Sequence, residues 1–119
     1  MLAVIFDLFG TLVPAVVDQE YRRNHAQMAC ALGIPEDAFR QCWRGLSDER
    51  GQGAFSSTEA TLAHVCRTLG VTVTAPQLTL ATELKVALTR RTLVPRGGAL
   101  ETLEALRQKG VLIGLISDC

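Results

Sequence analysis

The chain has 119 residues, of which 48% are hydrophobic, and its 12 basic side chains balance its 12 acidic ones. This length suits one domain with a packed core, and the neutral balance gives no electrostatic basis for binding nucleic acid or a membrane surface. The sequence has no apolar run long enough to span a bilayer and no basic N-terminus followed by a long apolar stretch, so we expect a cytoplasmic protein.

The first element in the chain is a short strand that ends at a carboxylate. β-Branched and aromatic residues follow one another without a polar break from Val4 to Phe6, which predicts a buried strand. Asp7 comes next, and in open α/β sheets ligands bind just beyond the carboxyl ends of the strands. Gly10 permits a tight turn beside it, and Thr11 offers a hydroxyl to orient it. Asp7 is therefore a candidate nucleophile or metal ligand, although strand-end aspartates also serve as simple loop caps.

Four helices are predicted after this strand, and the first two have clear ends. Asp18 as N-cap and Gly33 as terminator bound a helix from Asp18 to Leu32. A second helix opens at Pro35 and carries apolar residues as far as Leu46, before Gly51 to Gly53 interrupt it. Because apolar residues recur in both at close to helical spacing, each helix is expected to bury one face.

The third and fourth helices begin at cap sequences. Residues 56–59, S-S-T-E, predict a capping box in which Ser56 is the cap and Glu59 reaches back. Residues 74–77, T-A-P-Q, open the fourth helix with an early proline and a glutamine at the third position. The valines and threonines at 71–74 also fit a strand, but the segment is short and lies between two helical patterns. We therefore predict a loop there.

The last part of the chain predicts a crossover back to a second strand. After a turn-rich joint at 94–98, a helix runs from about Ala99 to Lys109, and a buried strand follows from Val111 to Ile116. A helix between two strands favours parallel pairing. If the strands are neighbours, Asp7 and Ser117 face one crevice. Residues 1–14 and 94–119 then form an α/β core, and residues 15–93 form a helical cap inserted after the first strand.

The cysteines and histidines are not spaced as metal ligands. No C-x-x-C pair occurs, so neither structural zinc nor a disulfide is expected, and each histidine is expected to be a packing or surface residue. These residues are Cys30, Cys42, Cys66, Cys119, His25 and His64.

Three segments together resemble the haloacid dehalogenase superfamily. F-D-L-F-G-T-L-V at 6–13 resembles its first motif, and L-I-G-L-I-S-D-C at 112–119 resembles its second, with P-R-G-G-A-L-E-T-L-E-A-L-R-Q-K-G at 95–110 leading into it. The resemblance implies an α/β fold with a Rossmann-like core, here partial with two parallel strands, and an inserted four-helix cap. It also implies hydrolysis of a small anionic substrate.

The same resemblance implies roles for individual residues. Asp7 would be the covalent nucleophile, and the Ser117 hydroxyl would hold the transferring phosphoryl group or the substrate anion. Phe9, Gly10 and Thr11 would line the substrate site. A magnesium ion would be held by Asp7 and the backbone carbonyl of Phe9, if the enzyme is a phosphatase. A dehalogenase would need no cofactor.

Two residues depart from the family pattern. Phe9 stands where phosphatases of the superfamily carry an acid that protonates the leaving oxygen, and a phenyl ring cannot transfer protons. An aromatic residue there resembles the dehalogenase branch, in which halide leaves as an anion from a 2-haloacid. Asp118 stands where asparagine is usual, and its carboxylate would repel an anionic substrate. Arg44 and Arg50 are candidates for a cap-side anion contact, but a solvated helix residue is the simpler interpretation of either.

The third and fourth motifs of the superfamily, which supply a basic residue and further acidic residues, have no match in the sequence. We therefore expect the chain to be the N-terminal part of a larger hydrolase, inactive by itself. The alternative is a catalytically silent interaction module on the same scaffold. Two strands with unpaired edges also predict self-association.

Overall fold

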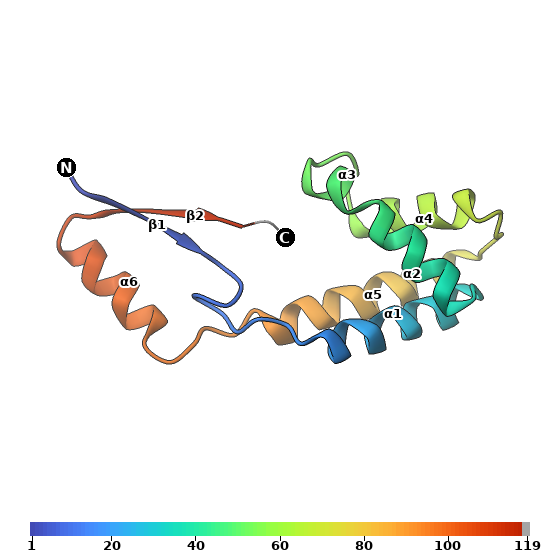
Figure 1. Cartoon of the computed structure of the whole chain (residues 1–119), viewed down its shortest axis with the longest axis horizontal. Helices are drawn as coiled ribbons and strands as arrows, with labels where there is room; N and C mark the ends of the chain where they lie inside the picture. The colour runs from blue at the N-terminus through green and yellow to red at the C-terminus, as the bar shows by residue number, and fades with distance from the viewer. Residues whose placement is uncertain (118–119) are drawn as a thin grey trace. The chain divides into compact units, whose positions relative to one another are not determined.

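The computed structural model describes residues 1–117 (Figure 1). It contains two strands and six helices in the described range, which is the α/β class predicted from the sequence. In chain order they are β1 (Ala3–Asp7), α1 (Asp18–Leu32), α2 (Glu36–Gly45), α3 (Ser47–Gly51), α4 (Thr58–Thr68), α5 (Ala75–Thr92), α6 (Ala99–Gln108) and β2 (Leu112–Ile116). No helix within residues 1–117 is both long and apolar enough to cross a bilayer.

The chain forms two compact units. Met1–Val17 and the residues from Thr89 onward form one, which we call the α/β unit, and Asp18–Leu88 forms the other, which we call the helical unit. The division falls inside α5. The domain boundaries expected from the sequence, after residue 14 and before residue 94, stay a prediction, because compactness alone does not show that the helical segment is an independent domain.

The α/β unit contains a two-stranded parallel sheet, as predicted. β1 pairs with β2 from Ala3 opposite Leu112 to Asp7 opposite Ile116. The helix α6 precedes β2 and packs against it, so it supplies the crossover that parallel strands need. Because paired residues of a parallel sheet lie side by side, the carboxyl ends of β1 and β2 share one edge.

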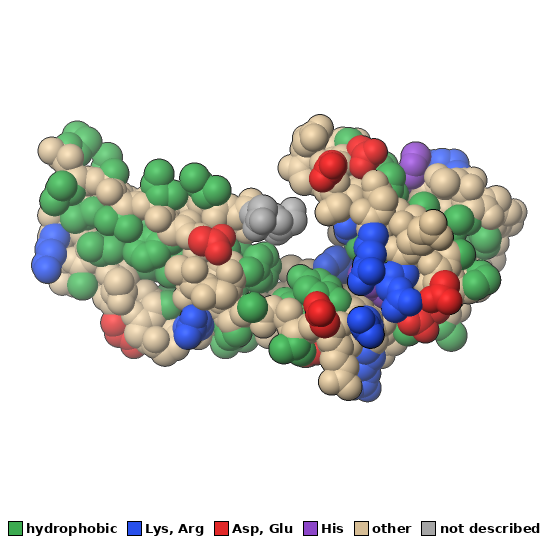
Figure 2. All heavy atoms as spheres, viewed as in Figure 1, with side chains coloured by type: hydrophobic (Ala, Val, Ile, Leu, Met, Phe, Trp, Pro, Cys, Tyr) green, Lys and Arg blue, Asp and Glu red, His purple; other side chains and the backbone are tan. Residues whose placement is uncertain are grey.

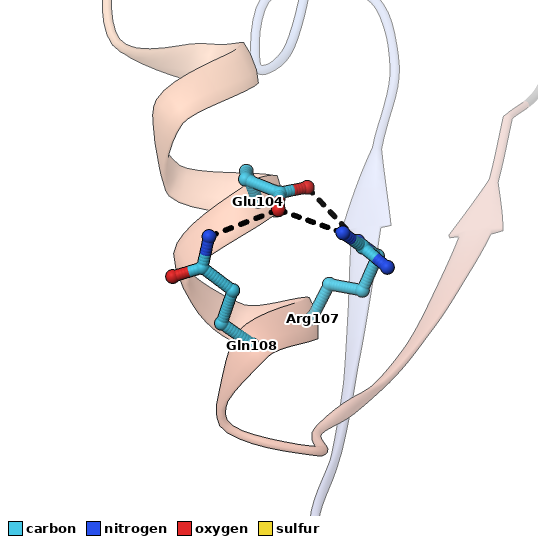
Figure 3. Close-up of polar contacts among 3 residues, drawn as sticks. All are labelled: Glu104, Arg107 and Gln108. Carbon is cyan, nitrogen blue, oxygen red and sulfur yellow. Dashed lines mark hydrogen bonds and ion pairs between the residues drawn. The ribbon is translucent and has the colours of Figure 1, made fainter.

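The exposed side of α6 carries a polar cluster near the end of the helix (Figure 3). The Arg107 guanidinium donates to both carboxylate oxygens of Glu104, at 2.8 and 2.9 Å, and the Gln108 amide donates to the same carboxylate at 3.0 Å. These bonds lower the pKa of Glu104 and raise that of Arg107. Since the cluster is exposed and local, it supports the last turn of the helix and suggests no binding function.

The helical unit is built around a continuous apolar core. Helices α1, α2, α4 and α5 each contribute the buried residues of one face. The members are Met28, Ala29, Leu32, Ile34, Phe39, Trp43, Leu62, Val65, Cys66 and Ala81. Phe39 and Trp43 stack with their ring centroids 5.7 Å apart. The prediction that each of the first two helices buries one face is confirmed.

The caps of α4 and α5 show one wrong prediction and one confirmed prediction. The Ser57 hydroxyl caps α4 by accepting from the backbone N–H of Ala60 at 3.0 Å, so the expected cap at Ser56 is wrong by one residue. At α5 the box is reciprocal: the Thr74 N–H donates to the Gln77 side chain at 2.9 Å, and the Gln77 N–H donates to the Thr74 hydroxyl at 3.4 Å. The loop predicted before α5 is confirmed, since no strand forms there.

The second predicted helix is interrupted earlier than expected. The helix α2 ends at Gly45, and Leu46 leaves helical geometry with φ −94° and ψ 12° before the short helix α3 begins at Ser47. Glycine has the weakest helix propensity apart from proline, and serine favours a helix start, so the break falls between them. The structure therefore has five helices between β1 and the joint at 94–98, where the sequence predicted four.

Candidate functional site

The candidate site lies at the carboxyl edge of the two-stranded sheet. Asp7, the last residue of β1, pairs with Ile116, the last residue of β2, and Ser117 follows directly. From the spacing of neighbouring strands and the rise per residue, the Cα atoms of Asp7 and Ser117 lie about 6 Å apart. The pairing therefore brings together two residues that are far apart in sequence.

The two side chains differ in their surroundings. Asp7 is exposed and lies on the same face of β1 as Ala3 and Ile5. Ser117 is half-buried, and its Oγ atom is buried with no hydrogen-bond partner within residues 1–117. Ser117 lies beyond the last residue of β2, so strand alternation does not determine its direction. A buried hydroxyl without a partner costs free energy, which makes Ser117 the polar group at this edge most in need of one.

The turn after Asp7 is held by its own backbone. The Leu8 carbonyl accepts from the N–H groups of Thr11, Leu12 and Val13 at 3.0 to 3.3 Å, and the Gly10 N–H donates to the Val13 carbonyl at 2.8 Å. Gly10 has φ +80°, a left-handed conformation that side chains with a Cβ rarely adopt. The sequence prediction of a tight turn that depends on this glycine is confirmed.

The three residues expected to line the substrate site lie on this turn. Phe9 is half-buried and forms an isolated parallel bridge with Val13, while Gly10 and Thr11 are exposed. The Thr11 side chain makes no hydrogen bond to Asp7 in the structure. The turn therefore brings all three close to Asp7 along the chain, but their contact with a substrate stays a prediction.

Arg96 is a site residue that the sequence reasoning missed. Its backbone N–H donates to the Leu12 carbonyl at 2.8 Å, and its guanidinium donates to the Gly10 carbonyl at 3.1 Å. Gly10 is 86 residues away from Arg96 in sequence, so no local periodicity could predict the contact. The signal available in the sequence was an arginine in the turn-rich joint before α6. Asp118, the second departure from the family pattern, lies outside the described residues.

The family comparison agrees with this geometry. Residues 1–118 match the family of haloacid dehalogenase-like hydrolases. The chain belongs to this family. Searches of the curated proteins and of the solved structures found no match.

Haloacid dehalogenase-like hydrolases commonly use Mg²⁺, so the site can be tested for a fit to that ion. Mg²⁺ prefers six oxygen ligands in near-octahedral geometry. The Asp7 carboxylate and the Phe9 carbonyl could supply two, but within residues 1–117 no three Asp, Glu, His or Cys side chains come together as a metal site. The described residues do not make a magnesium site by themselves, and we derive no chemical step through a metal.

The helical unit contains a buried polar residue, His25, beside three aromatic rings. His25 is 8% exposed, and its ring lies 6.1 to 6.3 Å from the rings of Phe39, Trp43 and Tyr21, as centroid distances. Burial, followed by the positive charge of Lys85 and of three arginines, lowers the pKa of His25 to about 4. His25 is thus a neutral packing residue near pH 7, as the sequence predicted, and is not suited to act as a base at that pH.

Arg50 lies beside this aromatic group. Its guanidinium carbon is 4.1 Å from the centroid of the Trp43 ring, and its Nε donates to the Leu46 carbonyl at 3.4 Å. A cation over an indole ring is attracted by the quadrupole of the ring. Since this stacking gives Arg50 a structural role in the helical unit, we assign it no part in binding an anion. The thiols of Cys42 and Cys66, whose pKa values are raised by burial, also belong to the packing.

Proposed function

We propose that this protein is a hydrolase in which Asp7 is the covalent nucleophile and Ser117 holds the anionic group of a small substrate. A carboxylate oxygen of Asp7 attacks phosphorus in a phosphate ester, or the halogen-bearing carbon of a 2-haloacid, and forms an ester or acyl phosphate. The bond to the leaving group breaks in the same step. Water then hydrolyses the intermediate and restores the carboxylate.

The observation that carries the proposal is the pairing of β1 with β2. It brings the carboxyl ends of both strands to one edge, where ligands bind in open α/β sheets. Asp7 is exposed there and accessible to a substrate, and the unpartnered Ser117 hydroxyl can donate to an oxyanion. Membership of the family supports hydrolysis in general, and these two side chains support this form of it.

The residue at position 9 bears on which leaving groups the enzyme can expel. An alkoxide leaving group needs a proton, which a phenyl ring cannot supply, whereas halide leaves as a stable anion. Phe9 therefore favours 2-haloacids and phosphate esters with good leaving groups over ordinary alkyl phosphates. For a phosphate ester, Mg²⁺ with ligands beyond Asp7 and Phe9 is part of the proposal. For a 2-haloacid, no cofactor is needed.

Measuring turnover by the protein that the gene encodes tests both substrate classes, 2-haloacids and phosphate esters. Chloride release from 2-chloropropionate and phosphate release from an aryl phosphate are measured for the wild type, Asp7→Asn and Asp18→Asn. Asp18 is an exposed aspartate at the start of α1 and is the matched control. We expect Asp7→Asn to abolish the activity and Asp18→Asn to retain it. Unchanged turnover in Asp7→Asn would exclude Asp7 as the nucleophile.

The intermediate can be tested independently of steady-state rates. If water attacks the carbonyl carbon of an Asp7 ester, a single turnover in ¹⁸O-labelled water places the label in the Asp7 carboxylate. For a 2-haloacid, direct attack of water on the substrate leaves Asp7 unlabelled and contradicts the covalent step. An acyl phosphate that water attacks at phosphorus also leaves Asp7 unlabelled, so the label is a test for the 2-haloacid class alone. The Ser117→Ala variant should raise KM more than it lowers kcat, because the proposed role of the hydroxyl is to hold the anion.

A second candidate function is a catalytically silent interaction module that binds through the strands. The observation that favours it is the exposure of apolar side chains on β1 and β2: Ile5 is 63% exposed, Leu115 54% and Ile116 66%. Figure 2 shows hydrophobic side chains gathered over the part of the molecule that holds β1 and β2. For such a module, no turnover is expected with either substrate, and strand pairing with a second copy is the proposed interaction.

A further inference from the structure

The turn that follows Asp7 is attached to the joint before α6. Two carbonyl groups of the turn accept hydrogen bonds from one residue of the joint. The Arg96 N–H donates to the Leu12 carbonyl at 2.8 Å, and the Arg96 guanidinium donates to the Gly10 carbonyl at 3.1 Å. All of these residues belong to the α/β unit, so the contact lies within one compact part of the chain.

Arg96 is itself fixed by the start of α6. Its carbonyl accepts from the Ala99 N–H at 3.0 Å, and Gly98 takes a left-handed conformation with φ +84° directly before the helix. The helix α6 packs against β2, which ends next to Ser117. Arg96 therefore connects the turn that carries Phe9, Gly10 and Thr11 to the element that leads to the second strand.

The guanidinium bond adds to the turn's own backbone bonds at its most flexible residue, Gly10. Gly10 has φ +80° and no side chain to restrict it, and apart from its chain neighbours the nearest atom to the place where a Cβ would be is the Ala15 Cβ, at 3.9 Å. A glycine peptide has more conformations available than any other, so its carbonyl direction is determined only by what it bonds to. The Arg96 guanidinium supplies that bond three residues after Asp7, and a hydrogen bond from a charged donor is stronger than one from a neutral donor.

We propose that Arg96 is a positioning residue for the reaction: its guanidinium holds the Gly10 carbonyl, which fixes the turn and with it the direction of the Asp7 carboxylate. The inference rests on the proposed function of Asp7. Arg96 does not touch the reacting atoms in this account. Its backbone bond to Leu12 survives any substitution except proline, so the guanidinium can be tested separately.

The first experiment measures the protection of the turn from hydrogen exchange, independently of enzyme activity. Amide hydrogen exchange of residues 8–13 is followed by mass spectrometry in the wild type, Arg96→Met, Arg96→Lys and Arg90→Met, with the peptides of the helical unit as internal reference. Arg90 is an exposed arginine of the same unit and is the matched control for loss of charge. Loss of one side-chain hydrogen bond should speed exchange in the turn roughly three- to tenfold in Arg96→Met, and not in Arg90→Met. Unchanged exchange in Arg96→Met overturns the proposal.

The second experiment asks whether the turn positions Asp7. With whichever substrate the wild type turns over, Arg96→Met should lower kcat roughly ten- to hundredfold with little change in KM, and Arg96→Lys should recover part of the loss. Faster exchange in the turn with unchanged kcat shows that Arg96 fixes the turn but not the nucleophile, which also overturns the proposal.

Failure of the proposed function gives a different pattern. In that case Asp7→Asn keeps the wild-type turnover, or the wild type has none with either substrate, while Arg96→Met still speeds exchange in the turn. The proposed effect of Arg96 on kcat is then refuted together with the proposed function. Failure of the inference alone leaves Asp7→Asn inactive and Arg96→Met fully active.

Discussion

The two units of this chain differ in how much of their hydrophobic surface they bury. Phe39, Met28 and Leu62 of the helical unit are fully buried, whereas Val13 is the one buried hydrophobic residue in the described part of the α/β unit. Among residues 1–117, all but two of the large hydrophobic side chains that are exposed lie in the α/β unit, and the exceptions are Tyr21 and Leu80. The proposed chemistry thus belongs to the unit with the smaller core.

This difference separates the sources of stability from the sources of function. Burial of apolar area is the main favourable term in folding, so the helical unit has the means to fold by its own contacts. The α/β unit leaves most of its sheet surface in water, so its order depends more on hydrogen bonds. Substitutions in the two units should therefore affect different observables.

The largest expected effect comes from the core of the helical unit. Phe39→Ala removes a fully buried ring that stacks on Trp43, and such truncations cost about 3–5 kcal/mol. Leu115→Ala, at a residue that is 54% exposed, should cost less than about 1 kcal/mol. Urea unfolding followed by the fluorescence of Trp43, the single tryptophan of the chain, reports on the helical unit, and circular dichroism of the same samples reports on both units. Equal losses in the two variants would contradict the contrast between the units.

The second largest expected effect is a dependence of the stability of the helical unit on pH. Burial and nearby cations lower the pKa of His25 from 6.5 to about 4, so the unfolded chain binds a proton in this range that the folded chain does not. Stability is therefore full above pH 6.5 and falls as the pH drops towards 4, by about 3 kcal/mol at most. Urea unfolding midpoints, measured by circular dichroism between pH 7 and pH 4, give the change in stability with pH.

Two histidine variants test whether His25 causes this dependence of stability on pH. His25→Phe keeps an aromatic ring in the cluster and should remove most of the dependence between pH 6.5 and 4. His64→Gln leaves His25 intact and should retain it. If His25→Phe loses stability on acidification as steeply as the wild type, another group carries the effect.

The sequence could predict the features that depend on local pattern. Both strands, the bounds of α1 and the helix opening at 74–77 follow from residue type and short spacing. Parallel pairing follows from the helix between the strands. Asp7 and Ser117 were found by their places after apolar runs, and the pairing of the strands brings those places together. Their chemical roles stay predictions.

Features that depend on close competition or on distant contacts could not be predicted. Ser56 and Ser57 are equal cap candidates by residue type, and the structure has Ser57 as the cap. In α5, Ala81 is buried while the larger Leu80 next to it is 49% exposed, so side-chain size does not identify the buried face. The bond between Arg96 and Gly10 spans 86 residues and leaves no periodic signal.

The exposed strands give a third, smaller effect that is specific to the α/β unit. If copies of the chain pair through their sheets, Ile5→Lys should weaken association about tenfold, since a lysine on an exposed strand opposes strand pairing between chains. Sedimentation over a range of concentrations measures it. Tyr21→Lys, at an exposed position of the helical unit, is the control and should leave association unchanged. A chain that stays monomeric at all concentrations in the wild type would refute self-association through the sheet.

The smallest effect compares two neighbouring serines in the helical unit. The Ser57 hydroxyl accepts from the Ala60 N–H at 3.0 Å, and its loss in Ser57→Ala leaves that N–H without its cap, at a cost of about 1 kcal/mol. Ser56 is exposed and makes no hydrogen bond of its own in the described structure, so Ser56→Ala should change stability by less than about 0.5 kcal/mol. Both are measured by the urea midpoint of Trp43 fluorescence. Because the two substitutions are chemically identical and adjacent, a larger loss in Ser56→Ala would place the start of α4 one residue earlier and restore the sequence-based cap.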